Sequence, residues 1–348
     1  MVEAHRALRG IAAALLLPLS WASTASEAQA APVRLEQISD EPQLILSEQD
    51  EELGLSDITW LGGDRYLAVG DREGKLYFLR IPIDADTGAI QQVELERIQV
   101  LAGARDLEAV IQHPERRTCF VTDEAPDDDQ PVREHDCSDG RLISAFAPTE
   151  RADRLRRNTG LEGLTYDGSV DALFAASEGP LRGDGPAPTE RAGAWARVFA
   201  FGAAGEPIAE WAYHVDATPG DVPLFDRELN GIAALAALGD GRLLVLERGL
   251  GAQGILGLPG FRHRIYLVTP TSGSECSGAD SLPSDGVAAM PKRLLWEGSF
   301  GPAFNFEGIT FGPALSDASR LLLLVSDDGA GLGRAVLPLR VSHGEPTA

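Results

Sequence analysis

The distribution of apolar and polar residues follows one frame five times along the chain. A large apolar residue is followed by a polar residue, then usually a small residue, then a second apolar residue. A turn comes next, often with Gly or Asp, and then an apolar run that ends in an acidic residue. Each such unit predicts two strands joined by a turn. The five units are residues 55–71, 107–124, 161–178, 229–247 and 306–328.

More apolar or alternating runs follow three of these units. They are residues 75–81 and 93–100 after the first unit, 196–202 and 208–215 after the third, and 264–270 and 292–298 after the fourth. Four antiparallel strands in each repeat of roughly fifty residues or more are typical of a propeller blade.

We therefore predict an all-β fold, a β-propeller of five to six four-stranded blades. A sixth blade would lie in the longer connections. Alternatively, the strand predicted at 33–39 would complete the last blade beside residues 333–341. A β-sandwich is the other candidate fold, and it is less favoured because sandwiches do not usually repeat a motif at this period.

The first thirty residues have the pattern of an export signal. Arg6 and Arg9 precede an apolar run at 11–19, and an A-x-A sequence occupies 28–30. We predict a signal peptide at 1–30 and a single domain at 31–348, exported to the periplasm or the medium. No later segment approaches the roughly 20 apolar residues needed to span a bilayer, so membrane insertion is not expected.

The charge restricts the possible partners. With 53 acidic residues against 30 Lys and Arg, the formal net charge is −23. Such a surface repels nucleic acid and anionic lipid, and it repels an anionic substrate unless a cation lies between them. There is no strand–GxGxxG–helix and no P-loop, so no nucleotide cofactor is expected. We expect a monomer that acts on a small molecule.

The second position of the frame carries the candidate chemistry. In a propeller the first strand of each blade lines the central channel, so these positions would form one ring. Converging carboxylates must either share protons or bind a cation, and oxygen donors without His or Cys suit Ca²⁺. The predicted metal ligands are Glu108, Glu162, Asn230 and Glu307, and Ser56 occupies the fifth position.

A structural role for the same residues stays open. Polar residues at blade starts often accept backbone N–H bonds from the next blade. The small residues that follow them would then allow close packing of the strands. These small residues are Ala109, Gly163, Gly231 and Gly308.

Two arginines lie next to acids at the ends of the second strands, Arg72 and Arg248. Guanidinium groups bind phosphate or carboxylate well, and the alternative for each is an ion pair with a neighbouring blade. We take Glu162, Arg248 and Arg72 as candidate catalytic residues. Nucleophilic catalysis has little support, since no G-x-S-x-G occurs.

The chain has three cysteines. Cys119 and Cys137 could form a disulfide across a hairpin in an exported protein, which would leave Cys276 unpaired. Three free thiols, or a zinc site with His135, are the alternatives.

Five stretches carry a resemblance to a known family. They are GLSDITWLGGDRYLAVGDREG (54–74), RDLEAV (105–110), NTGLEGLTYDG (158–168), LNGIAALAALGDGRLLVLERG (229–249) and NFEGITFGP (305–313). The chain resembles the phytase-like domain family, also described as having "esterase-like activity of phytase". The first stretch departs from the pattern at Asp57, where a small residue is usual.

The resemblance implies an exported propeller that hydrolyses phosphate or other esters. The positions it assigns to the site are Glu108, Glu162, Glu307, Asn230 and Arg248. We predict a metal-assisted esterase or phosphoesterase that uses Ca²⁺ at the central channel. The alternative is a propeller that binds a ligand or a protein without catalysis.

Overall fold

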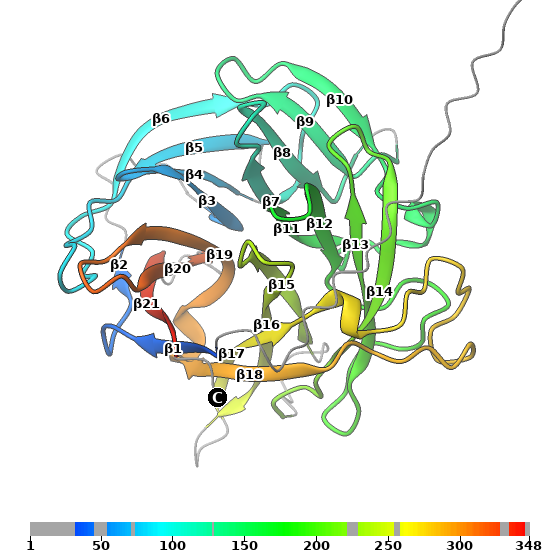
Figure 1. Cartoon of the computed structure of the whole chain (residues 1–348). Coiled ribbons are helices and arrows are strands. Elements are labelled where there is room, and N and C mark those ends of the chain that lie inside the picture. The colour runs from blue at the N-terminus through cyan, green and yellow to red at the C-terminus, as the bar shows by residue number, and fades with distance from the viewer. Residues whose placement is uncertain are drawn as a thin grey trace, which may run out of the picture.

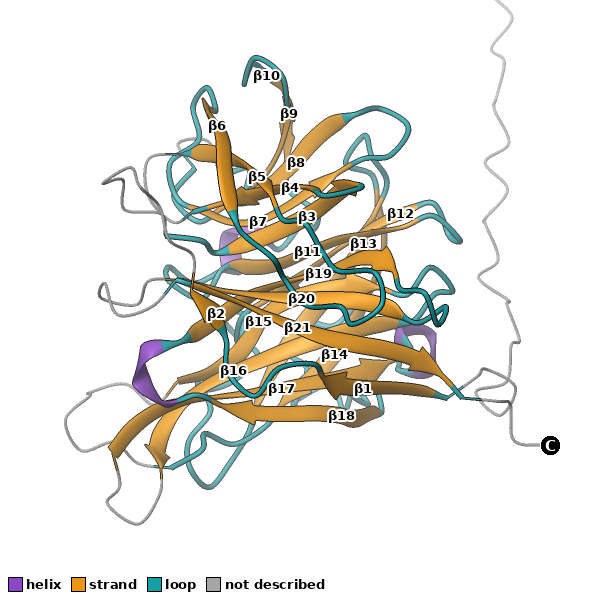
Figure 2. Ribbon diagram, turned by 90° about the vertical axis from the view of Figure 1, so that its left-hand side faces the viewer, coloured by secondary structure: helices purple, strands orange, loops and turns teal. Residues whose placement is uncertain are grey.

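The computed structural model describes residues 32–44, 54–70, 74–126, 129–220, 229–253, 258–327 and 334–344. The predicted signal peptide at 1–30 and Arg72 lie outside this range. Five antiparallel sheets surround one centre (Figure 1), which confirms the propeller. Figure 2 shows that strands fill the molecule, with only short helical turns between them. These 3-10 turns are η2 (Ala152–Arg154), η3 (Pro270–Ser272) and η4 (Gly301–Ala303).

Each of the first four blades consists of four strands that follow one another in sequence, from the centre outwards. Blade 1 has β3 (Asp57–Gly62), β4 (Arg65–Val69), β5 (Lys75–Arg80) and β6 (Glu94–Val100). Blade 2 has β7 (Leu107–Gln112), β8 (Thr118–Asp123), β9 (Val132–Asp136) and β10 (Leu142–Phe146). Blade 3 has β11 (Leu161–Asp167), β12 (Ala172–Ser177), β13 (Ala194–Phe201) and β14 (Pro207–Val215). Blade 4 has β15 (Leu229–Ala237), β16 (Leu243–Gln253), β17 (Leu258–Val268) and β18 (Lys292–Ser299).

The fifth blade joins the two ends of the described chain. Its inner strands are β19 (Asn305–Ala314), β20 (Arg320–Asp327) and β21 (Ala335–His343). The N-terminal strand β1 (Val33–Gln37) pairs with β21 on the outside, and β2 (Gln43–Leu44) pairs with the other end of β21. This confirms that the segment at 33–39 completes the last blade. The propeller has five blades, so the expectations of a sixth blade and of a sandwich are wrong.

The innermost strands form a closed ring. β3 contacts β7, β7 contacts β11, β11 contacts β15, β15 contacts β19, and β19 contacts β3. Corresponding positions of the five repeats are therefore brought together around one channel.

Apolar side chains fill the space between each pair of neighbouring blades. Phe120 and Phe199, for example, belong to the cluster between blades 2 and 3, and Leu246 and Phe306 belong to the one between blades 4 and 5. Successive side chains of a strand point to opposite faces of its sheet, and each face packs against one of the two neighbouring blades. Every blade is therefore buried on both faces. This explains why the inner strands read as almost continuous apolar runs.

At the third and fifth positions of the repeated frame, three side chains of the inner strands bind the backbone of the adjacent blade. Asp57 Oδ2 accepts a bond of 3.0 Å from Val110 N, and Thr165 Oγ1 accepts one of 3.0 Å from Ala237 N. Thr310 Oγ1 accepts a bond of 3.1 Å from Trp60 N. The third and fifth positions of the frame, rather than its second position, supply these bonds between blades.

A disulfide joins Cys119 in β8 to Cys137 just after β9, with the Cα atoms 5.3 Å apart. Both sulfur atoms are used in this bond, so the zinc alternative is wrong. Cys276 is buried and unpaired, and burial raises the pKa of its thiol to about 12.

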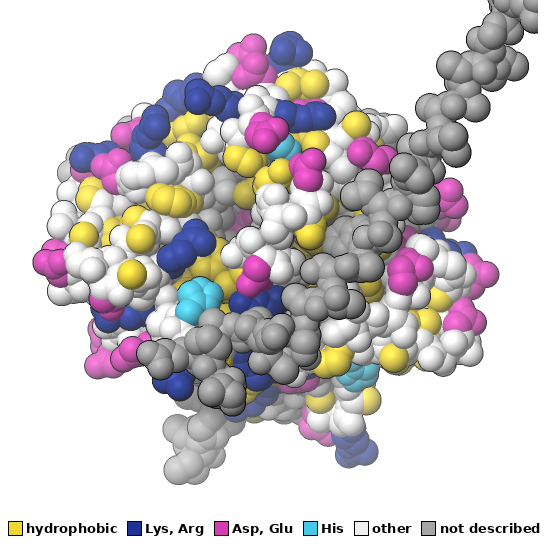
Figure 3. Space-filling view, in the orientation of Figure 1, with side chains coloured by type: hydrophobic (Ala, Val, Ile, Leu, Met, Phe, Trp, Pro, Cys, Tyr) yellow, Lys and Arg dark blue, Asp and Glu magenta, His cyan; other side chains and the backbone are white. Residues whose placement is uncertain are grey.

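The charged side chains are unevenly distributed on the face shown in Figure 3. Lys and Arg side chains follow the rim over β6 and β9, whereas Asp and Glu side chains are scattered over the surface.

Candidate metal and substrate site

Three of the repeated glutamates lie at the same irregularity in three different blades. Leu107 pairs with Asp123 and Ala109 with Thr122, which leaves Glu108 without an opposite residue. Equivalent β-bulges leave Glu162 in β11 and Glu307 in β19 without an opposite residue on the neighbouring strand. A bulge bends the strand and changes the direction of one side chain. At each bulge, the glutamate side chain therefore departs from the regular alternation of side chains along the strand. The three bulges lie at the same end of the ring of inner strands.

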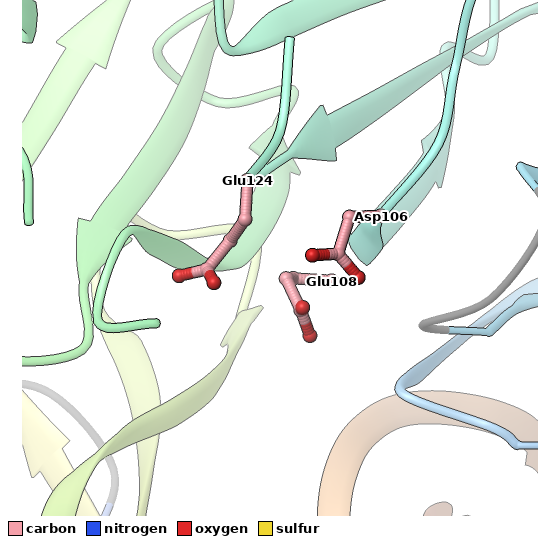
Figure 4. Close-up of side chains that lie close together, drawn as sticks. All are labelled: Asp106, Glu108 and Glu124. Carbon is pink, nitrogen blue, oxygen red and sulfur yellow. The ribbon is translucent and has the colours of Figure 1, made fainter. Parts of the chain in front are cut away.

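Glu108 belongs to a group of three carboxylates on blade 2. Asp106 precedes β7 and Glu124 follows β8, and the two residues are tied by a backbone bond of 2.9 Å from Glu124 N to Asp106 O. One oxygen from each of Asp106, Glu108 and Glu124 lies within 4.8 Å of the others. Figure 4 shows the three side chains gathered around one space. We call these three residues the acidic triad.

Burial and mutual repulsion act on the acidic triad together. Burial raises the pKa of Glu124 to about 7, although the Gly160 N–H donates to its carboxylate. Burial also raises the pKa of Asp106, and the charge of Asp123 adds to this effect. Carboxyl groups in such surroundings either hold protons or bind a cation.

Arg248, in β16, lies beside the same cluster. Its Nη2 atom is 3.1 Å from Glu178 Oε1 and 3.2 Å from Glu307 Oε1. It thus connects blade 3 to blade 5 through blade 4. The ion pair that the sequence left open as an alternative for Arg248 is present in the structure.

Glu162 interacts electrostatically with two residues of the acidic triad and with Arg248. Burial raises its pKa well above the usual value, and the charges of Glu108, Glu178 and Glu124 raise it further. The positive charge of Arg248 opposes this effect. Glu162 therefore interacts with both parts of the cluster.

The cluster holds more negative groups than positive ones. Among the described residues, the interactions above bring together six carboxyl groups and one guanidinium, that of Arg248. His263 is also buried, but burial and Arg248 lower its pKa to about 3, so it adds no positive charge at neutral pH. The six carboxyl groups belong to Asp106, Glu108, Glu124, Glu162, Glu178 and Glu307.

The residues fit a hard divalent cation. Carboxylates supply the oxygen donors that Ca²⁺ prefers. In addition, Asn305 Nδ2 donates to Glu307 Oε1 at 2.7 Å, while its Oδ1 atom is buried without a hydrogen-bond partner in the described part of the chain. Ser56 Oγ is likewise buried and unpartnered there. Both oxygens belong to the ends of inner strands where the carboxylates gather.

The other ring residues are placed differently. Asn230 Nδ2 donates to Asp216 O at 2.9 Å and to Glu247 Oε2 at 3.2 Å, so its amide nitrogen is used within blade 4. The sequence frame also missed Asp106 as a partner of Glu108, because Asp106 precedes the repeated frame. Glu124 is one of the strand-end acids, but only the fold shows that it faces Glu108.

The fold and this cluster define a class, a five-bladed propeller with a buried acidic site at one end of its channel. The chain belongs to the phytase-like family, whose profile, described as "esterase-like activity of phytase", matches residues 53–330. No curated protein matches the chain.

Several solved structures are similar in fold. An aldose sugar dehydrogenase from Streptomyces coelicolor is 13% identical, with a TM-score of 0.39 over 90% of this chain and 100% of that chain. A tail fibre of Staphylococcus aureus phage P68 is 11% identical, with a TM-score of 0.43 over 90% of this chain and 53% of that chain. A DUF4221 protein from Bacteroides vulgatus is 8% identical, with a TM-score of 0.41 over 89% of this chain and 99% of that chain. Among the described residues, no helix is long and apolar enough to cross a membrane.

Proposed function

We propose that this protein is an exported, metal-assisted phosphoesterase that acts on small phosphate esters at the acidic end of its channel. The observation that supports this proposal is a cluster of six buried or half-buried carboxyl groups, four of which interact with Arg248. The family match supports ester hydrolysis as the class of reaction. The disulfide between Cys119 and Cys137 suits an oxidising compartment outside the cytoplasm.

The acidic triad would hold Ca²⁺ through its carboxylate oxygens. When bound, the cation would neutralise a substrate oxyanion that the acidic protein otherwise repels, and it would favour attack by water. Arg248 would orient a second oxygen of the same phosphate, since its guanidinium already lies between Glu178 and Glu307.

Glu162 would move the proton. Burial and the surrounding carboxylates raise its pKa, which favours the protonated form that a general acid needs. Water forms a bond to phosphorus, the bond from phosphorus to the leaving oxygen breaks, and Glu162 transfers its proton to that oxygen. The attacking water then returns a proton to Glu162.

The test is turnover of a chromogenic phosphate monoester with Ca²⁺ present. Glu162→Gln should reduce kcat by about 100-fold or more, the usual scale for loss of a general acid, while the protein stays folded. Glu96→Gln, on exposed β6, is the matched control and should keep wild-type activity. Full activity of Glu162→Gln would place the chemistry elsewhere. A wild-type protein without turnover would favour the non-catalytic binding propeller.

A further inference from the structure

A pocket lies next to the acidic triad, between blades 2 and 3. Its volume is about 300 Å³. Its walls come from the loop after β8, from residues 152–161 ahead of β11, and from the segment after β12. Glu124 of the acidic triad is part of its wall. A ligand in this pocket would therefore lie beside the proposed metal site.

Four arginines and four acids make up the charged lining of this pocket. Arg105, Arg156, Arg157 and Arg182 all contribute to it. Such a concentration stands out in a chain with 53 acidic and 30 basic residues. We call this cavity the arginine pocket.

Three of these arginines form no ion pair within the described part of the chain. Arg156 Nη2 donates to the Gly185 carbonyl at 2.9 Å, and its buried Nε atom has no hydrogen-bond partner there. Arg182 Nη1 donates to the Asp153 carbonyl at 3.3 Å. These backbone carbonyls accept hydrogen bonds from the guanidinium groups, but they carry no formal negative charge that could form an ion pair with the arginines.

Two fully buried arginines of the protein have carboxylate partners. Arg197 binds both carboxylate oxygens of Asp184, at 2.7 and 2.9 Å, and Arg133 lies 3.3 Å from Asp123. The half-buried Arg156 and the exposed Arg157 and Arg182 have no such partner among the described residues, so their guanidinium groups can bind an anion that enters the pocket.

Among the described residues, the acids of the arginine pocket form no ion pair with Arg156, Arg157 or Arg182. Asp123 is fully buried, and it is occupied by Arg133 and by the backbone N–H groups of Arg105 and Asp106. Asp129 and Asp153 are exposed, and neither pairs with an arginine of the pocket among the described residues. Glu124 accepts the Gly160 N–H.

We propose that the arginine pocket binds a second oxyanion group of the substrate, a phosphate beyond the one that is hydrolysed. Guanidinium groups bind phosphate through paired, charge-assisted hydrogen bonds, and Arg156, Arg157 and Arg182, which have no carboxylate partner among the described residues, supply the donors. Its role in substrate selection rests on the proposed function, whereas oxyanion binding itself does not.

The experiment is a calorimetric titration of the full-length protein, stripped of divalent ions, with inorganic phosphate. Saturable binding is expected, and the double variant Arg156→Gln/Arg157→Gln should weaken it by at least tenfold. Arg191→Gln is the control, because Arg191 is exposed and pairs with the adjacent Glu190. Undetectable binding in the wild type, or equal affinity in the double variant, overturns the proposal.

A titration with acetate separates the two possible oxyanions. Binding of phosphate but not of acetate supports a phosphate group, whereas tighter binding of acetate overturns that choice. Turnover of a phosphate monoester is measured in parallel, with Ca²⁺ present. Phosphate binding without turnover would refute the hydrolase and keep the pocket. Turnover without phosphate binding in the metal-free protein would refute the pocket and keep the hydrolase.

Discussion

Adjacent positions of the repeated frame have distinct physical roles. The second position carries Glu108, Glu162 and Glu307, which lie at bulges and gather at the channel. The third position carries Asp57 in the first repeat, whose carboxylate binds Val110 N in blade 2. The departure of Asp57 from the family pattern is thus explained by a bond between blades.

This contact makes Asp57 a test of the packing between blades. Asp57→Ala should lower the free energy of unfolding by roughly 1–3 kcal/mol, because it leaves the buried Val110 N–H without an acceptor. Asp57→Asn keeps an acceptor of the same size and should cost less. Denaturant unfolding of both variants measures the difference. Equal stability of Asp57→Ala and wild type would contradict the assigned role.

The carboxyl groups of the site predict an unusual dependence of stability on pH. Burial raises the pKa of Glu307 from its ordinary value of 4.5 to about 7, against the opposing effect of Arg248. A raised pKa in the folded state favours the protonated form, so its contribution to stability is present below pH 4.5 and is lost as the pH rises through 7.

Glu307→Gln should therefore gain stability relative to the wild type as the pH rises. With divalent ions removed, the difference between the two proteins should change by up to roughly 3 kcal/mol between pH 4.5 and 7.5, at about 1.4 kcal/mol per pKa unit. Unfolding in urea at several pH values measures this change. A difference that stays constant, or that reverses in sign, would show that Glu307 is not destabilised by its surroundings.

At the scale of elements, the sequence predicts the inner strands better than the outer ones. The inner strands are buried on both sides, so their apolar runs are long and repeated. β9 and β10 give no such signal, because β9 contains the buried polar residues Arg133, Glu134 and His135. Tertiary ion pairs and hydrogen bonds stabilise these residues, and a pattern of apolar positions cannot show them.

The site illustrates the same limit. The repeat predicts that Glu108, Glu162 and Glu307 meet, because it fixes their place in the blades. It does not predict the bulges, or the pairing of Arg248 with acids from two other blades. The bulges form within single hairpins, where the apolar pattern does not mark them. The pairing of Arg248 depends on contacts between segments more than 50 residues apart.

The contribution of strand β1 to the stability of the fifth blade can also be tested. Val33 is fully buried in the cluster between blades 4 and 5. Val33→Ala removes two methyl groups and should lower the free energy of unfolding by roughly 2 kcal/mol. Leu44→Ala is a control in the same sheet, since Leu44 is 51% exposed. A larger loss for Leu44→Ala than for Val33→Ala in thermal unfolding would contradict this contribution.

For the whole molecule, the propeller collects acids from distant parts of the chain at one end of the channel. The net charge of −23 makes this arrangement unfavourable unless protons or a cation compensate it. A divalent cation bound by the acidic triad would offset this repulsion in the folded state, so binding should raise the melting temperature by mass action.

The central claim is that this acidic cluster binds a divalent cation, and a calorimetric titration with Ca²⁺ after removal of divalent ions tests it most directly. Saturable binding of about one ion is expected, at least tenfold weaker in Glu108→Gln and unchanged in the exposed control Glu96→Gln. The absence of binding heat and of any shift in melting temperature, or equal affinity in Glu108→Gln, would contradict the account. The repeated glutamates would then serve only the packing of the blades.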